Sequence, residues 1–272
     1  HYGDPWTGLQ GDEWDTIMNY DAFMEPVTWF LTGMQKHSDD FRQDMLGNAE
    51  SFMKSMKNAK TNIMAPAKTC SMNELSNHDH SRFLTRTNHV VGRIADKGAL
   101  AANEGVNKAV FMEAVVMQMT WVGAPTIYYG DEAGVCGFTD PDNRRTYPWG
   151  HEDKKLIDFH KDIIRIHKEN NELKHGSTKF LKGEYNLIAY GRFTIDEQSI
   201  IIINNNDYEK EVSLRISNTG IGSKAMLKQL IFTMDGDYSI SPNLFPVVTG
   251  KIKIFMPKFS AIVLKAVNVN DK

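Results

Sequence analysis

The sequence has few of the features that mark several classes of protein. It contains only two cysteines, Cys70 and Cys136, which lie far apart and form no C-x-x-C pair. Neither has a histidine or a second cysteine at ligand spacing, which argues against a structural zinc site. So low a cysteine content fits a reducing compartment or a chain that needs no disulfide, and we expect a cytoplasmic protein.

Long apolar runs and an excess of one charge are also missing. The longest apolar segment, residues 106–122, is interrupted by Lys108, Glu113 and Gln118, so we expect no membrane-spanning helix. The net charge is -3, with basic residues scattered along the chain, so we expect neither nucleic acid nor a membrane as a partner. The sequence begins at His1 without a methionine or a signal peptide. We expect a processed, cleaved or truncated piece, and the alternative of a lost leader stays open.

With 272 residues, the chain is long enough for a sizeable core or for two domains. Its first part alternates apolar runs with helical patterns, and polar residues follow the apolar runs. Helices are predicted at residues 25–33, 48–59, 106–122 and 153–170, and strands at 16–20, 62–65 and 126–129. This order predicts an α/β fold with a site at the carboxyl ends of its strands, as in a (β/α) barrel or a doubly wound sheet.

The second part has a different pattern. From residue 178 onward there is no helical period, and short alternating runs are separated by turn residues. Strands are predicted at residues 187–193, 199–204, 211–216, 226–234, 251–256 and 261–265. We therefore place a domain boundary near residues 174–177, with an α/β part at 1–175 and an antiparallel β-sandwich at 176–272.

The most concentrated polar stretch is residues 76–82, which read Ser-Asn-His-Asp-His-Ser-Arg. It follows residues 62–75, which are predicted to lead into a buried strand. Polar groups held at the end of a strand predict a binding or catalytic site. The alternative is a polar loop whose Asn and Asp cap the helix that follows.

Four short motifs in this order resemble the alpha-amylase family (glycoside hydrolase family 13), especially its cyclomaltodextrinase-, neopullulanase- and maltogenic-amylase-like members. The family's Met-Asn-Tyr, Asn-His-Asp, Gly-x-Pro-x-x-Tyr-Tyr-Gly-x-Glu and Asp-Pro-x-Asn-Arg motifs match residues 18–20, 77–79, 123–132 and 140–144. The resemblance implies the C-terminal part of a (β/α)8 TIM barrel, about strands 6 to 8, followed by an antiparallel β-sandwich domain C. It also implies a retaining glycosidase that acts on α-glucosidic bonds of maltodextrin, cyclodextrin or starch-type oligosaccharides.

The resemblance assigns a role to each matching residue. Asp79 would be the catalytic carboxylate that holds the sugar hydroxyls and stabilises the oxocarbenium-like transition state. The predicted substrate-binding residues are His78, Asn77, Arg82, Asp140, Arg144, Tyr20 and Trp6, of which Arg82 and Trp6 lie outside the four motifs. A structural alternative stands beside several of them. His78 could be a core histidine, the two arginines could form structural ion pairs, and Trp6 could be local packing.

No cofactor is expected. The spacing of His78, His80 and His89 suggests a metal, but no carboxylate or cysteine at helical spacing supports one. In the resemblance, calcium would belong to other parts of a full-length protein, and no residue of this chain supports it.

Two catalytic groups of the family are missing from this sequence. The nucleophilic Asp follows the fourth barrel strand and the acid Glu the fifth, and residues 1–6 look like the loop just after that Glu. We therefore expect a C-terminal fragment, inactive alone, that binds an α-glucan together with the N-terminal half of the same protein or a second copy. The alternatives are a glucanotransferase or isomerase on the same scaffold, or a non-catalytic glucan-binding or scaffold protein. The presence of Asp79 argues against the last.

Overall fold

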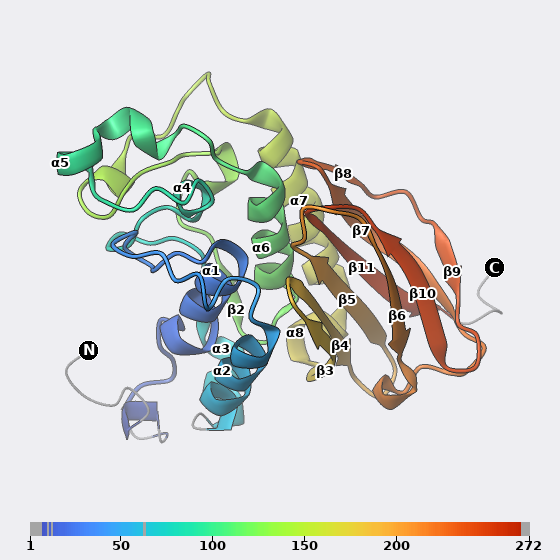
Figure 1. Cartoon of the computed structure of the whole chain (residues 1–272). Helices are drawn as coiled ribbons and strands as arrows, with labels where there is room; N and C mark the ends of the chain where they lie inside the picture. The colour runs from blue at the N-terminus through green and yellow to red at the C-terminus, as the bar shows by residue number, and fades with distance from the viewer. Residues whose placement is uncertain (1–6, 10, 12, 62–63, 268–272) are drawn as a thin grey trace. The chain divides into compact units, whose positions relative to one another are not determined.

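The computed structural model describes residues 7–9, 11, 13–61 and 64–267. Trp6 lies outside the described residues. The chain forms two compact units (Figure 1). Unit 1 contains His1–Val106 and Val122–Ile157, and unit 2 contains Asn107–Trp121 and Asp158–Lys272.

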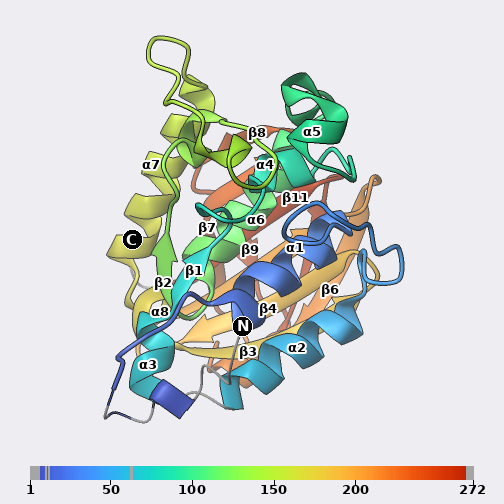
Figure 2. The same cartoon turned by 90° about the vertical axis from the view of Figure 1, so that its left-hand side faces the viewer.

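Unit 1 contains a short parallel sheet. Strands β1 (Met72–Glu74) and β2 (Ala124–Thr126) pair in parallel, with Met72 opposite Ala124. Met18 adds one parallel bridge to Met72, so three chain segments lie side by side (Figure 2). Because parallel strands end at the same edge, the loops that follow β1 and β2 leave the sheet together.

The helical elements of unit 1 lie before, between and after these strands along the chain. The predicted helix at residues 25–33 is confirmed as α1 (Glu25–Thr32), which starts after the π-helical turn η2 (Tyr20–Met24) and ends at Gly33, whose φ is +69°. The predicted helix at 48–59 is confirmed as α2 (Ala49–Thr61). The other helical elements of unit 1 are η1 (Thr7–Leu9), α3 (Ala65–Cys70), α4 (Phe83–Arg86), α5 (Ile94–Lys97), η3 (Ala99–Ala102), η4 (Asp131–Ala133) and η5 (Asp142–Arg144).

The strand predictions in this part need correction. The run at 16–20 pairs only at Met18, because the chain enters η2 at Tyr20. The predicted strand at 62–65 is wrong at its described end, because α3 begins at Ala65 with a proline in its first turn. Residues 62–63 lie outside the described residues. The strand predicted at 126–129 lies earlier, at Ala124–Thr126, and the backbone oxygen of Tyr129 accepts a side-chain hydrogen bond from Arg82 instead.

The helices predicted at residues 106–122 and 153–170 are confirmed, whereas the short helix at Asn171–His175 was not predicted. Helix α6 (Lys108–Thr120) begins at Asn107, whose side chain accepts hydrogen bonds from the backbone N–H groups of Ala109 and Val110. Every residue from Ala109 to Thr120 is buried, as expected for a helix that is apolar nearly all round. Helix α7 (Lys154–Glu169) confirms the amphipathic pattern predicted at 153–170, and the short α8 (Asn171–His175) follows it.

The rest of unit 2 consists of two antiparallel sheets. The larger has seven strands in the order β3-β4-β5-β11-β7-β8, with β9 also pairing with β7, and the smaller joins β10 to β6. The strands are β3 (Ser177–Glu184), β4 (Leu187–Phe193), β5 (Gln198–Asn204), β6 (Lys210–Arg215), β7 (Met226–Met234), β8 (Asp237–Ser239), β9 (Leu244–Pro246), β10 (Lys251–Met256) and β11 (Ser260–Val267), with the turn η6 (Ser217–Thr219) after β6. One apolar core lies between the two sheets, to which β5 contributes Ile200 and Ile202 and β10 contributes Ile252 and Ile254.

The change from helices to strands occurs at Ser177, next to the predicted boundary. The compact units divide the chain differently, because α6 and most of α7 belong to unit 2. The division into domains at residues 1–175 and 176–272 therefore stays a prediction. None of the described helices is both long and apolar enough to cross a membrane.

Candidate active site

The loop that follows β1 is organised by Asn77. Its side chain is 2% exposed, and its Oδ1 accepts hydrogen bonds from the backbone N–H groups of Asp79 at 3.0 Å and His80 at 3.1 Å. Its Nδ2 donates to the Tyr20 hydroxyl at 2.9 Å and to Glu74 Oε2 at 3.1 Å. Tyr20 is largely buried as well. The hydrogen bonds of Asn77 fix the shape of the loop. Direct sugar binding by these two residues stays a prediction.

His78 and Asp79 point away from this buried scaffold. Their side chains are 53% and 54% exposed, and His78 Nε2 lies 3.5 Å from Asp79 Oδ1. The alternative of a buried core histidine is therefore wrong for His78. A half-exposed carboxylate beside an imidazole can accept hydrogen bonds from a ligand hydroxyl, while the imidazole can donate one.

The loop that carries Asp140 and Arg144 lies against the same segment. Asp140 Oδ1 is 2.6 Å from Arg144 Nε, and both side chains are about half exposed. Arg144 Nε also donates to the backbone oxygen of His78 at 3.2 Å. The Thr139 hydroxyl donates to the backbone oxygen of Asp79. The fold thus brings together four predicted site residues from two loops about sixty positions apart in the sequence.

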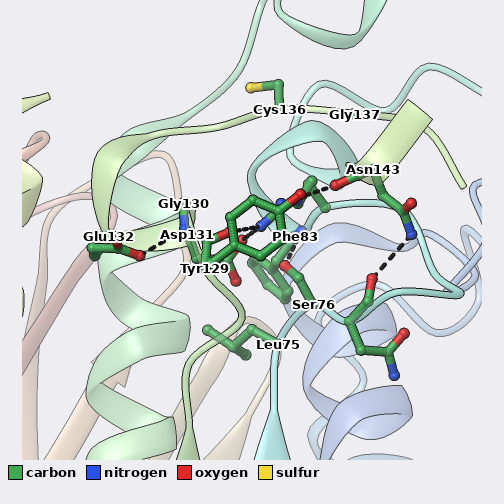
Figure 3. A network of polar contacts seen from close by, with 12 residues as sticks. Leu75, Ser76, Phe83, Tyr129, Gly130, Asp131, Glu132, Cys136, Gly137 and Asn143 are labelled. Atoms are coloured by element: carbon green, nitrogen blue, oxygen red, sulfur yellow. Dashed lines mark hydrogen bonds and ion pairs between the residues drawn. The ribbon is translucent and has the colours of Figure 1, made fainter. Parts of the chain in front are cut away.

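Arg82 has a different environment from the one expected. Its side chain is fully buried, and its Nη1 forms an ion pair with Asp131 Oδ1 at 2.9 Å. The same group donates to the backbone oxygen of Tyr129 at 2.6 Å, and Nε donates to the backbone oxygen of Asn143 at 2.9 Å. These contacts favour the structural alternative for Arg82. They join the loop after β1 to the loop after β2, where Figure 3 shows Tyr129, Asp131 and Asn143 gathered.

Close backbone approach within the loop after β2 requires a glycine at position 137. A Cβ added there would lie 2.5 Å from the backbone oxygen of Asp142 and 2.8 Å from Asn143 Cα. The backbone oxygen of Gly137 accepts a hydrogen bond from the Arg82 N–H at 2.9 Å, and its own N–H donates to the Thr85 hydroxyl. Any larger residue would therefore displace the backbone of Asp142 and Asn143, next to the exposed Arg144.

Near the exposed groups lie three titratable side chains, of which the sequence singled out only His80. Burial, with a smaller contribution from the Arg86 cation, lowers the pKa of His80 to about 2, so this imidazole is neutral. Its ring packs edge-on against His37, whose pKa burial also lowers and whose Nδ1 lies 3.0 Å from the Thr139 hydroxyl. Burial raises the pKa of Glu74. No group of three or more potential ligands among the described residues could hold a metal ion.

A family model for the alpha-amylase catalytic domain matches residues 9–182. The chain belongs to the alpha-amylase family. It is 31% identical, over 97% of its length, to the amylopullulanase of Thermoanaerobacterium thermosulfurigenes, and covers 14% of that protein. It is 33% identical, over 78% of its length, to the cyclomaltodextrinase of Thermoanaerobacter pseudethanolicus, and covers 32% of it. The debranching enzyme of Nostoc punctiforme has a similar fold, with a TM-score of 0.74 and 23% identity over 97% of this chain and 50% of that one.

Membership of the alpha-amylase family agrees with the four motifs, and the structure adds residues that no motif assigned. Glu74, Thr139 and Asn143 all contact the loop of Asp79. The motif at residues 140–144 includes Asn143 as one of its defined residues but assigns it no role. The hydroxyl of Thr139, just before that motif, gave no signal in the sequence.

Proposed function

We propose that this chain supplies part of the active site of a retaining glycosidase that acts on α-glucosidic bonds of maltodextrin, cyclodextrin or starch-type oligosaccharides. The chain spans less than a third of the two enzymes compared by sequence, so this activity is a proposal about a larger assembly. The observation that carries it is the convergence of Asp79, His78, Asp140 and Arg144 at one exposed surface.

In this proposal, the β1–β2 part is the C-terminal portion of a (β/α)8 barrel, and the two antiparallel sheets are the β-sandwich domain C. The parallel pairing of β1 with β2 and the bridge at Met18 support the barrel. The core shared by the two sheets supports the sandwich. The partner is the N-terminal half of the same protein or a second copy of this chain. The N-terminal half contributes the nucleophile and the general acid, which a second copy of this chain lacks, and without that half the chain is inactive.

The chemistry assigned to this chain is electrostatic. When the glycosidic bond breaks, positive charge develops at the anomeric carbon and the ring oxygen. The Asp79 carboxylate accepts hydrogen bonds from sugar hydroxyls, and these bonds strengthen as that charge develops. The Asp140–Arg144 pair offers an acceptor and donors to the hydroxyls of the next sugar. No proton transfer is assigned to Asp79.

The test is the replacement Asp79→Asn in the complete enzyme, meaning residues 1–272 together with the part that holds the nucleophile and acid. We expect kcat on maltotriose to fall at least about 100-fold, because a preorganised charge facing the transition state is lost. The matched control is Asp39→Asn, since Asp39 is an exposed carboxylate in the same unit that pairs with Arg93 at 2.6 Å.

Full activity of the Asp79→Asn enzyme would contradict the proposal, as would appreciable hydrolysis by residues 1–272 alone. Analysis of the products from maltotriose distinguishes hydrolysis from transfer. Glucose and maltose alone support the glycosidase, whereas chains longer than the substrate indicate a glucanotransferase.

A further inference from the structure

Asn143 connects the two loops of the candidate site through its side chain. The side chain is fully buried, and its Nδ2 donates to the backbone oxygen of Asn77 at 3.0 Å and to that of His80 at 2.7 Å. These two carbonyl groups flank His78 and Asp79. One amide group therefore holds both ends of the segment that presents the proposed catalytic carboxylate.

The chemistry of the contact determines the orientation of the amide. Backbone carbonyl groups only accept hydrogen bonds, so the NH2 group of Asn143 must face them and its two N–H bonds serve one carbonyl each. The side-chain oxygen has no hydrogen-bond partner within the described part of the chain. The side chain thus acts as a double donor, which an aspartate of the same shape cannot do.

The backbone of Asn143 is fixed by separate contacts. Its oxygen accepts a hydrogen bond from Arg82 Nε at 2.9 Å, and its Cα lies against Gly137. The next residue is Arg144, which pairs with Asp140. Asn143 is therefore a buried connection between the segment that carries Asp79 and the Asp140–Arg144 pair, beneath the exposed contact of Arg144 with His78.

We infer that Asn143 is a positioning residue, which sets the distance between the Asp79 carboxylate and the Asp140–Arg144 pair and so aligns both with one sugar chain. This inference rests on the proposed function. Asn143 is buried and does not contact the sugar, so it acts through Asp79. Without the two donors, the segment from Asn77 to His80 loses two of the contacts that fix it and keeps those from Thr139 and Arg144. Displacements of about 1 Å in an active site can cost about 100-fold in rate.

The test compares Asn143→Ala and Asn143→Ser in the complete enzyme. We expect Asn143→Ala to lower kcat on maltotriose about 10- to 100-fold, with a smaller change in KM. Asn143→Ser keeps one donor and should lose less, with a kcat between those of the wild type and the alanine variant. If the alanine variant does not fold, the serine variant carries the test, with a kcat loss at wild-type Tm as the expected result.

Asn204 provides the matched control in unit 2. It is also fully buried, and its Nδ2 donates to the backbone oxygens of Tyr208, Met256 and Pro257 at 3.2, 3.4 and 2.7 Å. Asn204→Ala should lower Tm at least as much as Asn143→Ala, yet leave kcat per folded molecule unchanged.

Two results would overturn the inference. In one, Asn143→Ala and Asn143→Ser keep kcat within about twofold of the wild type. In the other, kcat falls in proportion to Tm in the Asn143 variants and in Asn204→Ala alike. That result would show that Asn143 has a purely structural role. Failure of the proposed function is distinguishable, because it appears as full activity of Asp79→Asn whatever the Asn143 variants do.

Discussion

The loop after β1 in unit 1 and the seven-stranded sheet in unit 2 are both well packed, but by different kinds of side chain. The loop is held by buried polar groups, including Asn77, Arg82, Arg86 and Asn143. The sheet is held by an apolar core of residues such as Ile202. Hydrogen bonds have a preferred distance and direction, whereas apolar contacts are non-directional. Because its scaffold consists of directional hydrogen bonds, the loop in unit 1 can hold charged groups in defined positions.

The largest effect on stability should come from Arg82 in the loop scaffold. We expect Arg82→Met to lower the free energy of unfolding by about 3–5 kcal/mol, because it removes one partner of a buried ion pair. The exposed Arg144 is the control, and Arg144→Met should cost less than about 1 kcal/mol. Urea denaturation of both variants measures the difference. Equal losses of unfolding free energy in the two variants would mean that the burial of Arg82 does not make its ion pair more important for stability than that of Arg144.

A slightly smaller effect is expected in the apolar core of unit 2. Ile202 is fully buried between the two sheets, and Ile202→Ala should destabilise the protein by about 2–5 kcal/mol. Because this core holds none of the site residues, the affinity for maltotriose of the folded fraction should not change. Calorimetric titration below the unfolding temperature measures that affinity. A loss of binding would show that unit 2 takes part in the site.

The smallest expected effect concerns a buried carboxyl group in α6. Glu113 is fully buried, neither of its oxygens has a partner among the described residues, and burial raises its pKa well above 4.5. Above pH 4.5 the unfolded chain releases this proton while the folded chain keeps it, so stability falls as pH rises. Between pH 5 and 6 the loss should reach up to about 1.4 kcal/mol. Glu113→Gln should remove this dependence, and an equally steep loss in that variant would refute the assignment.

The same comparison explains what the sequence could predict. The bounds of β4, β7 and β10 match the predicted strands residue for residue, because alternation and turn residues are local signals. The buried helix α6 was equally clear from its apolar run. In unit 1, two predicted strands did not form as expected. The run at 62–65 leads into α3, which has a proline in its first turn, and the run at 16–20 pairs only at Met18.

The motifs singled out His78, Asp79, Asp140 and Arg144, whose exposed side chains lie together in the structure. Their roles at a sugar site stay predictions. Arg82 is a charged residue whose burial depends on a partner 49 positions away, and Asn143 reaches carbonyl groups 63 and 66 positions away. No local pattern in the sequence encodes such distances. Their roles became visible only in the folded chain.

The most direct test of the account is to locate bound sugar on the folded chain by amide chemical shifts. Titration of isotope-labelled residues 1–272 with maltotriose should shift the amide signals of residues 77–80 and 139–145, and Asp79→Asn should weaken those shifts. The opposite result would be shifts confined to unit 2, for example at the groove lined by Pro246, Val248 and Lys253. That outcome would contradict the claim that the loops after β1 and β2 form the sugar-binding surface.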